Sequence, residues 1–312
     1  MKPATQPPPA STAQNATKPT REHARGEAPR VGVVVITRNR RASLLGTLRQ
    51  LRELPERPPV VVVDNGSTDG TADAVRRDFP QVRLVCPGRN LGAVGRTHGA
   101  AALTTPYVAF SDDDSWWEPG ALRRAADLLD AHPRLALIAA ATRVGPHGLP
   151  DPLNDALLNS PLGRDPDLPG PGVLGFLACA AVLRRTAFLS VGGFHPVLHF
   201  GAEETLLALD LDARHWGVAH CPDVIARHHP DEQPRLGRTV RVRRNEVLTA
   251  WLRRPLRHAV GQTARLMADC RRDAEARAAL REAAQRLPAA LARRRRLPPR
   301  VERRVRLLER GR

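Results

Sequence analysis

Short apolar runs alternate with segments of helical spacing over the first half of the chain, and this alternation constrains the fold more than any other feature. The first run, 31–37, reads VGVVVIT and is rich in β-branched residues, which is typical of a strand buried on both faces. Further strands are expected at 60–63, 82–85, 107–110 and 135–140. Helical patterns separate them at 42–53, 71–78, 92–103 and 118–131. Strands that alternate with helices predict an α/β fold with a mostly parallel sheet.

Polar residues follow several of these strands directly. They are Thr37-Arg38-Asn39 after the first strand, Asp64 after the second, and Asp112-Asp113-Asp114 after the fourth. Open α/β sheets bind their ligands at the carboxyl ends of the strands. We therefore expect a ligand site where these three groups meet.

The three consecutive aspartates are the sharpest feature of this edge. Adjacent carboxylates repel one another, and Mg²⁺ or Mn²⁺, which prefers oxygen ligands, offsets that repulsion. In an extended segment Asp112 and Asp114 point the same way and Asp113 points the other way. The pattern favours a metal that bridges a diphosphate. The alternative is that Asp114 or Ser115 only caps the next helix.

The sequence after the second strand, Asp64-Asn65-Gly66-Ser67, has two interpretations. A carboxylate at a strand end can accept hydrogen bonds from a ribose or a base, but the same residues are common in turns. A dinucleotide-binding domain also has an acid here, but it needs a glycine-rich turn after the first strand. Segment 37–41 contains no glycine, which disfavours a dehydrogenase.

The net charge of +17 is concentrated at one end of the chain. Segment 235–312 contains 24 arginines and seven acidic residues, whereas the rest of the chain has equal numbers of basic and acidic residues. Its pattern predicts an arginine-rich helical region. Such a region attracts polyanions, and we expect membrane-surface or lipid-phosphate contact rather than nucleic acid, because it has only one aromatic residue, Trp251. The alternative is a solvated helical tail.

The N-terminal segment 1–29 is rich in Pro, Ser, Thr and Ala and lacks an apolar core. It is interpreted as a disordered leader rather than a signal peptide. No apolar run reaches the roughly 18–20 residues that span a bilayer. We expect a cytoplasmic protein, in peripheral contact with the inner face of the membrane.

Four motifs in order resemble family 2 glycosyltransferases of the GT-A fold. They read VVVITRNR, VVVDNGSTDGT, RNLGAVGR and FSDDDSWWEPGAL, and they are followed by the similar segments GGF, AEETLLALDL and PDVIARHH. The resemblance covers about 30–229 and is closest to the rhamnosyl- and galactofuranosyl-transferring branch. It implies a GT-A domain over 30–234, with a nucleotide-binding half at 30–145 and an acceptor half at 146–234. A Rossmann-like, mostly parallel sheet flanked by helices is expected, with the helical basic region 235–312 as an extension.

The resemblance also implies roles for individual residues. Those expected at the nucleotide-sugar are Thr37, Arg38, Asn39, Asp64, Asn90, Gly92, Arg96, Asp112 and Asp113. Asp112 and Asp114 match the Asp-x-Asp element that holds Mn²⁺ or Mg²⁺, and His228 matches a histidine that completes the metal shell.

Glu203-Glu204 matches the acidic pair whose second member is the catalytic base. Relatives often have Asp there, and an acid where this chain has Leu206. Each assignment has a plainer alternative: the two glutamates favour the start of a helix, and His228 is a surface residue. Trp116-Trp117 either stacks on an acceptor sugar or packs in the core.

The function predicted is an inverting, metal-dependent transfer of sugar from a nucleotide-diphosphate donor to a hydroxyl acceptor. The acceptor is expected to be a glycan, a glycolipid or a secondary metabolite, and a lipid-linked one fits the basic region. The alternative is a non-catalytic α/β protein that uses this region to bind membrane or nucleic acid. A glycoside hydrolase needs no Asp-x-Asp element, and a nucleotidyltransferase usually has an early glycine-rich loop that this chain lacks.

Overall fold

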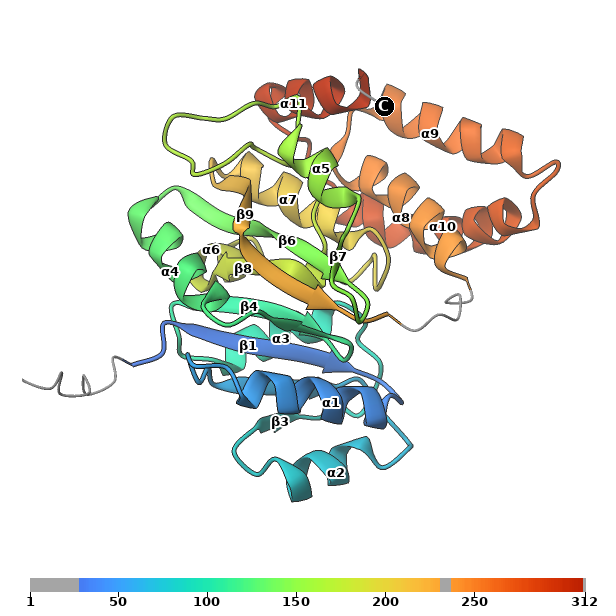
Figure 1. The fold of residues 1–312 in the computed structure, drawn as a ribbon. Coiled ribbons are helices and arrows are strands. Elements are labelled where there is room, and N and C mark those ends of the chain that lie inside the picture. Colours follow the sequence, from blue (N-terminus) through green and yellow to red (C-terminus); the bar gives the residue numbers. More distant parts are fainter. Residues whose placement is uncertain (1–27, 231–236, 311–312) are drawn as a thin grey trace, which may run out of the picture.

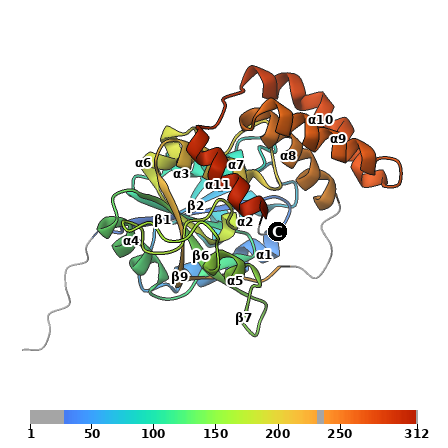
Figure 2. The ribbon, with the colours of Figure 1, turned by 90° about the horizontal axis from the view of Figure 1, so that it is seen from above.

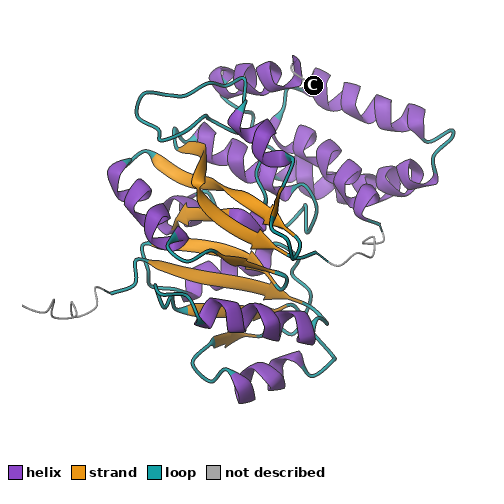
Figure 3. Cartoon of the chain, in the orientation of Figure 1, coloured by secondary structure: helices purple, strands orange, loops and turns teal. Residues whose placement is uncertain are grey.

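The computed structural model describes residues 28–230 and 237–310 (Figures 1 and 3). Nearly all of the expected leader, 1–27, lies outside the described residues. The strands are β1 (Val31–Thr37), β2 (Val60–Asp64), β3 (Arg83–Val85), β4 (Tyr107–Asp112), β5 (Ser115–Trp117), β6 (Leu135–Val144), β7 (Leu149–Pro150), β8 (Ala181–Arg184) and β9 (Gly217–His228). The helices are α1 (Arg41–Arg52), α2 (Thr71–Asp78), α3 (Val94–Ala102), α4 (Ala121–Ala131), α5 (Leu153–Leu158), α6 (Arg185–Ser190), α7 (Glu203–Ala213), α8 (Arg238–Arg253), α9 (Leu256–Asp269), α10 (Ala274–Ala292) and α11 (Pro299–Arg310).

The strands form a single mixed sheet in the order β3-β2-β1-β4-β8-β6-β9-β5, with β7 paired to β6. Pairing is parallel from β3 to β4 and between β6 and β9, whereas β8 runs antiparallel to both of its neighbours. The predicted α/β fold with a sheet of mostly parallel strands is therefore confirmed. The register pairs Thr37 with Asp64 and Ile36 with Asp112, which aligns the predicted ligand-binding segments at one edge.

Both faces of the sheet are covered by helices. Val33 and Val35 of β1 face Leu44 and Leu48 of α1, in a core that α4 extends. Val34 faces the opposite core, which α3, α6 and α7 complete and to which Phe188 contributes. Burying a leucine or valine side chain stabilises the fold by about 1.5–3 kcal/mol. Burial on both faces explains why these strands are continuous apolar runs rather than alternating ones.

The segment after the three aspartates departs from expectation. Ser115–Trp117 forms β5, which pairs antiparallel with β9, and Ser115 lies opposite His228. Helix α4 begins only at Ala121, and its N-cap is Gly120, in a left-handed conformation that suits glycine. Neither Asp114 nor Ser115 caps this helix. Instead the Ser115 hydroxyl accepts a hydrogen bond from the Asp112 N–H.

The C-terminal region is helical, as predicted, but it is packed against the rest of the molecule rather than trailing from it (Figure 2). Helices α8, α9 and α10 share an apolar core with Val197, Leu198 and Leu206 of the preceding part of the chain. Helix α11 returns to the sheet domain, where Val301 is fully buried in the core that includes α7. In the described part of the chain no helix is both long and apolar enough to cross a membrane.

Several C-terminal arginines form ion pairs with carboxylates of the protein itself. Arg254 pairs with Glu302 and Glu309 of α11, and Arg300 of α11 pairs with Asp212 of α7. These contacts fasten α11 to the body of the protein. The alternative of a solvated helical tail therefore does not describe these paired arginines.

Candidate active site

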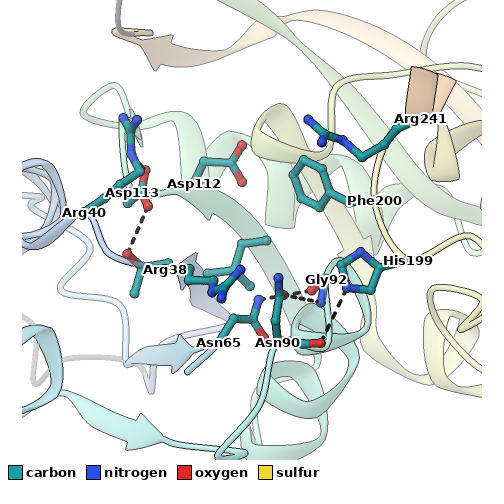
Figure 4. A pocket seen from close by; sticks show the side chains of 12 residues that line it. Arg38, Arg40, Asn65, Asn90, Gly92, Asp112, Asp113, His199, Phe200 and Arg241 are labelled. Carbon is teal, nitrogen blue, oxygen red and sulfur yellow. Dashed lines mark hydrogen bonds and ion pairs between the residues drawn. The ribbon is translucent and has the colours of Figure 1, made fainter. Parts of the chain in front are cut away.

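A cavity of about 370 Å³ opens at the carboxyl edge of β1 and β4 (Figure 4). Its walls come from six separate segments of the chain. The lining residues are Ile36, Thr37, Arg38, Arg40, Asn65, Asn90, Gly92, Asp112, Asp113, His199, Phe200 and Arg241. The site lies where the sequence predicts it, and its size suits a small ligand.

Asp113 is held by the first strand and by the turn after it. Thr37 Oγ1 donates a hydrogen bond to Asp113 Oδ2 over 2.9 Å, and Arg40 Nε donates to Asp113 Oδ1 over 2.6 Å. Ser43 and Thr47 of α1 donate to its carbonyl oxygen. Burial raises the pKa of the Asp113 carboxyl to about 7, although the Arg40 charge acts in the opposite direction. The whole turn is thus fixed by α1.

Asp112 is tied to a buried arginine of α3. Arg96 Nη2 donates to Asp112 Oδ1, and Arg96 Nη1 lies 3.8 Å from Glu203 Oε1. The guanidinium lies over the rings of Phe194 and Phe200, at 5.6 and 5.9 Å from their centroids. Arg96 is 1% exposed, so it lies behind the cavity rather than in its wall. It joins the aspartate cluster to the acidic pair.

Asp114 and His228 face one another on the β5–β9 side of the cluster. His228 Nε2 lies 3.4 Å from Asp114 Oδ1, and Arg40 Nη2 donates to Asp114 Oδ2 over 3.0 Å. A carboxylate and an imidazole are both ligands that Mn²⁺ accepts. Within residues 28–230 and 237–310, however, no three such side chains are placed to enclose a metal ion by themselves. The pair can supply part of a coordination shell, which a diphosphate would have to complete.

Asn39 and Asp64 stabilise turns rather than line the cavity. Asn39 has a positive φ of 54°, and its Oδ1 accepts from the Thr68 N–H. Asp64 is buried, and its Oδ1 accepts from the Ser67 N–H. The neighbouring Asn65 lines the cavity instead. The contacts that Asp64 makes are therefore those of a turn, which is one of the two interpretations of segment 64–67 given above.

Asn65 fixes the loop that carries Asn90 and Gly92. Its Nδ2 donates to the Gly92 carbonyl and its Oδ1 accepts from the Leu91 N–H. Gly92 has a φ of 60°, and a Cβ there would lie 2.4 Å from the His199 carbonyl oxygen. Only glycine allows this approach, by which the loop contacts the 198–202 segment. His199 and Phe200 thereby enter the cavity wall.

Glu203 and Glu204 begin α7 immediately after a strained residue. Ala202 has a left-handed φ of 57°, and the carbonyls before it are held by α8: Asn245 Nδ2 donates to the Leu198 and Phe200 carbonyls. Glu203 is 2% exposed. Burial, followed by the charge of Glu204, raises the pKa of Glu203 to about 8. As a whole residue Glu204 is half-buried, whereas Glu203 is almost fully buried.

The two tryptophans after the aspartates have different environments. Trp117 is fully buried in the sheet core. Trp116 is half-buried, and its ring lies 4.5 Å from that of His229. Packing is therefore the observed role of Trp117.

The structure brings most of the predicted residues together but distributes them over two shells. Asp112 and Asp113 line the cavity together with Thr37, Arg38, Asn90 and Gly92, and Arg96 lies directly behind it. Glu203, Glu204, Asp114 and His228 lie outside the cavity lining. Sequence reasoning missed Arg40, Asn65, His199, Phe200 and Arg241. Arg40 and Asn65 belong to the motifs quoted above, whereas Arg241 of α8 belongs to no motif that could have identified it.

The cavity lies at the carboxyl edge of an α/β sheet, with an aspartate cluster and an acidic pair beside it, which is an arrangement that suits a group-transfer enzyme. Residues 32–192 match the family described as glycosyl transferase family 2, and the chain belongs to that family. The glycosyltransferase class and the resemblance to its rhamnosyl-transferring branch are confirmed.

Among characterised relatives, the chain is similar to N-acetylglucosaminyl-diphospho-decaprenol L-rhamnosyltransferase of Mycobacterium tuberculosis, with 27% identity over 63% of this chain and 75% of that protein. It is 40% identical to validoxylamine A glucosyltransferase of Streptomyces hygroscopicus subsp. limoneus, over 28% of this chain and 21% of that protein.

Two solved structures share the fold. A mannosyltransferase of Pyrobaculum calidifontis, in complex with GDP-Man and Mn²⁺, superposes with a TM-score of 0.54 at 24% identity, over 91% of this chain and 80% of that one. TarS of S. aureus, in complex with UDP-GlcNAc, gives 0.56 at 17% identity, over 82% and 72%. The predicted GT-A fold is therefore confirmed.

Proposed function

We propose that this glycosyltransferase moves a sugar from a nucleoside-diphosphate donor to a hydroxyl acceptor in one inverting displacement assisted by a divalent cation. The observation that carries the proposal is the Asp112–Arg96–Glu203 connection. It places the acidic pair beside the aspartate cluster at the ligand-binding edge of the sheet. Family membership favours the enzyme over the non-catalytic binding protein that the sequence left open.

The cavity provides groups for each part of the donor. Arg38 and Asn65 lie on one wall, and Phe200 and Arg241 lie on the opposite wall (Figure 4). Aromatic and amide groups suit a nucleobase and ribose, and the guanidinium groups suit a diphosphate. Asp64 lies behind this wall, so we propose that it supports the base-binding turn. Phe200 and Arg241 then close the cavity over the donor.

Asp114 and His228 would hold the metal ion, with Asp112 beside them and the donor diphosphate completing the shell. The pair fits this role because a carboxylate and an imidazole already lie 3.4 Å apart. A bound Mn²⁺ or Mg²⁺ would neutralise charge on the leaving nucleoside diphosphate. In the structure, the Arg40 guanidinium donates to both Asp113 and Asp114. Arg40 thus offsets the repulsion between neighbouring carboxylates in the protein alone.

Glu204 would act as the base. The acceptor oxygen attacks the anomeric carbon, the bond from that carbon to the diphosphate oxygen breaks, and the acceptor proton passes to a Glu204 oxygen. Glu204 is more exposed than Glu203, and burial raises its pKa above the ordinary glutamate value. Glu203, beside Arg96, would orient the start of α7. Its own exposure of 2% leaves no room for an acceptor.

We further propose a lipid-linked acceptor and peripheral membrane contact. The mycobacterial relative acts on a decaprenol-linked substrate, as its name says. On α9, Leu256, Val260 and Met267 share one face and are each more than half exposed. Such a stripe, with the exposed Arg257 beside it, is typical of helices that lie on anionic membranes. Sedimentation with phosphatidylglycerol vesicles should fall in Val260→Glu, and equal sedimentation would refute this contact.

The experiment that tests the function is nucleoside-diphosphate release from a panel of nucleotide sugars, with Mn²⁺, with Mg²⁺ and with EDTA. Release from one donor that is lost in EDTA would establish both the transfer and the metal requirement. Release that persists in EDTA would support the proposed transfer but refute the proposed metal requirement. If no donor is turned over, calorimetry with nucleoside diphosphates follows, and absence of binding in either metal would refute the proposal.

A further inference from the structure

A second cavity, of about 310 Å³, lies at the opposite end of α7 from the acidic pair. It is enclosed by the end of α6, the end of α7, the end of α8 and the linker between α10 and α11. Its lining residues are Val191, Asp210, Ala213, Arg214, Arg253, Arg295, Arg296, Leu297 and Pro298. At a rise of 1.5 Å per residue, Arg214 lies about 15 Å along the helix from Glu204. The cavity is therefore separate from the donor site.

Four arginines and one carboxylate face this cavity. Arg253, whose side chain is 7% exposed, makes a two-pronged ion pair with Asp210, in which Nη2 and Oδ2 are 2.8 Å apart. The other three, Arg214, Arg295 and Arg296, are exposed, and among the described residues no carboxylate forms an ion pair with them. About three positive charges thus converge on one enclosed volume without compensation from the protein.

Neighbouring arginine side chains add to the positive charge of the cavity. Burial and the nearby charges of Arg253, Arg293 and Arg295 lower the pKa of His195 to about 4, although Asp210 acts in the opposite direction. The helix ends at the cavity do not add to this charge, because the positive start of α11 after Pro298 is accompanied by the negative C-terminal ends of α6, α7 and α8. Packing fixes this arrangement, because Leu297 and Val301 are buried in the core on either side of the helix start. The arginines are therefore presented by a rigid frame.

We propose that this cavity, defined here as the arginine cavity, binds a phosphorylated ligand. Three uncompensated guanidinium groups match a group that carries two or more negative charges better than a single carboxylate. Guanidinium forks bind phosphoryl oxygens in pairs. The volume accommodates a diphosphate or a phospholipid headgroup, and both present the same chemistry. The site is independent of the sugar transfer proposed above.

Calorimetry with inorganic diphosphate tests the site, in the presence of EDTA so that no metal is available at the donor cavity. The variant is Arg295→Gln/Arg296→Gln, which removes two exposed charges from the arginine cavity. The matched control is Arg271→Gln/Arg272→Gln, which removes two exposed charges from the turn before α10. Thermal unfolding verifies that both variants are folded, and the same proteins are sedimented with phosphatidylglycerol and phosphatidylcholine vesicles.

The expected result is diphosphate binding that weakens at least tenfold in the cavity variant and by less than twofold in the control, with sugar transfer unchanged in both. A lipid source would appear instead as phosphatidylglycerol sedimentation that only the cavity variant loses. Equal effects in the two variants would show general charge attraction and overturn the proposal. Absence of both diphosphate and phosphatidylglycerol binding by the unaltered protein would also overturn it. Because transfer is assayed separately, failure of this site leaves the proposed function intact.

Discussion

Arg96 joins Asp112, at the end of β4, to Glu203, at the start of α7. Its Nη2 donates to Asp112 Oδ1, and its Nη1 lies 3.8 Å from Glu203 Oε1. All three side chains are largely buried, so the Arg96 cation pairs with the Asp112 carboxylate in surroundings of low polarity and lies next to Glu203, whose pKa burial raises to about 8. Removing one partner of such a group leaves uncompensated buried charge, which costs about 3–5 kcal/mol.

Arg96→Met should therefore lower the free energy of unfolding by about 3–5 kcal/mol and abolish sugar transfer. Arg96→Lys keeps the charge but loses the fork, and it should recover part of the stability. Urea denaturation and nucleoside-diphosphate release measure the two effects. Stability of Arg96→Met equal to that of the unaltered protein would show that Asp112 leaves no uncompensated buried charge when Arg96 is removed.

Glu204→Gln should reduce transfer by roughly 10²–10⁴-fold, because no carboxylate is left to take the proton from the attacking hydroxyl group. Donor binding, measured by calorimetry with the nucleoside diphosphate, should change little. Thr205→Ala, at the exposed neighbouring position of α7, is a suitable control. Turnover close to that of the unaltered protein in Glu204→Gln would remove the residue from the base role.

Asp114→Asn should weaken donor binding and flatten the response of activity to Mn²⁺, since it removes one carboxylate from the proposed metal shell. Asp223→Asn changes an exposed carboxylate on β9 and should leave the titration unchanged. The measurement is activity against metal concentration for the three proteins. A Mn²⁺ titration of Asp114→Asn that superposes on the original would contradict the metal site.

Glu203 should contribute stability that is lost as pH rises from about 5 to 8, because burial lets it keep its proton in the folded state up to a pKa of about 8. The unfolded chain releases this proton near the ordinary glutamate value of about 4.3. The folded state therefore binds more protons in this interval, and raising the pH favours unfolding. Glu203 faces Arg96 and Glu204, which lower and raise its pKa respectively. Glu203→Gln should have a flatter unfolding profile across this interval, and an unchanged slope would contradict the assignment.

The sheet and the ligand-binding edge could be predicted because they depend on local patterns. Buried apolar runs identify β1, β2 and β4, and the polar residues after them must lie at one edge of a parallel sheet. The three-residue strand β5 was missed because it is too short for a periodic pattern. Its pairing with β9 depends on a contact between residues more than 100 positions apart.

The composition of the cavity wall could be predicted only in part. Thr37, Asn90 and Asp113 belong to contiguous motifs, so the sequence itself identifies them. Phe200 and Arg241 reach the cavity because α8 packs beside α7, and nothing in their neighbouring residues encodes that packing. Asn39 was expected at the ligand, but its side chain is engaged by a turn hydrogen bond from Thr68.

The hydrogen bonds from Asn245 to the Leu198 and Phe200 carbonyls have a consequence for protein engineering. A chimera that joins this sheet domain to the C-terminal helices of another enzyme would replace the side chain that shapes the entrance to α7. Acceptor preference and the alignment of Glu204 would then change together. The sheet domain and helices α8 to α11 should therefore be exchanged as one piece, because α8 also packs with α9 and α10 and α11 packs on the sheet domain.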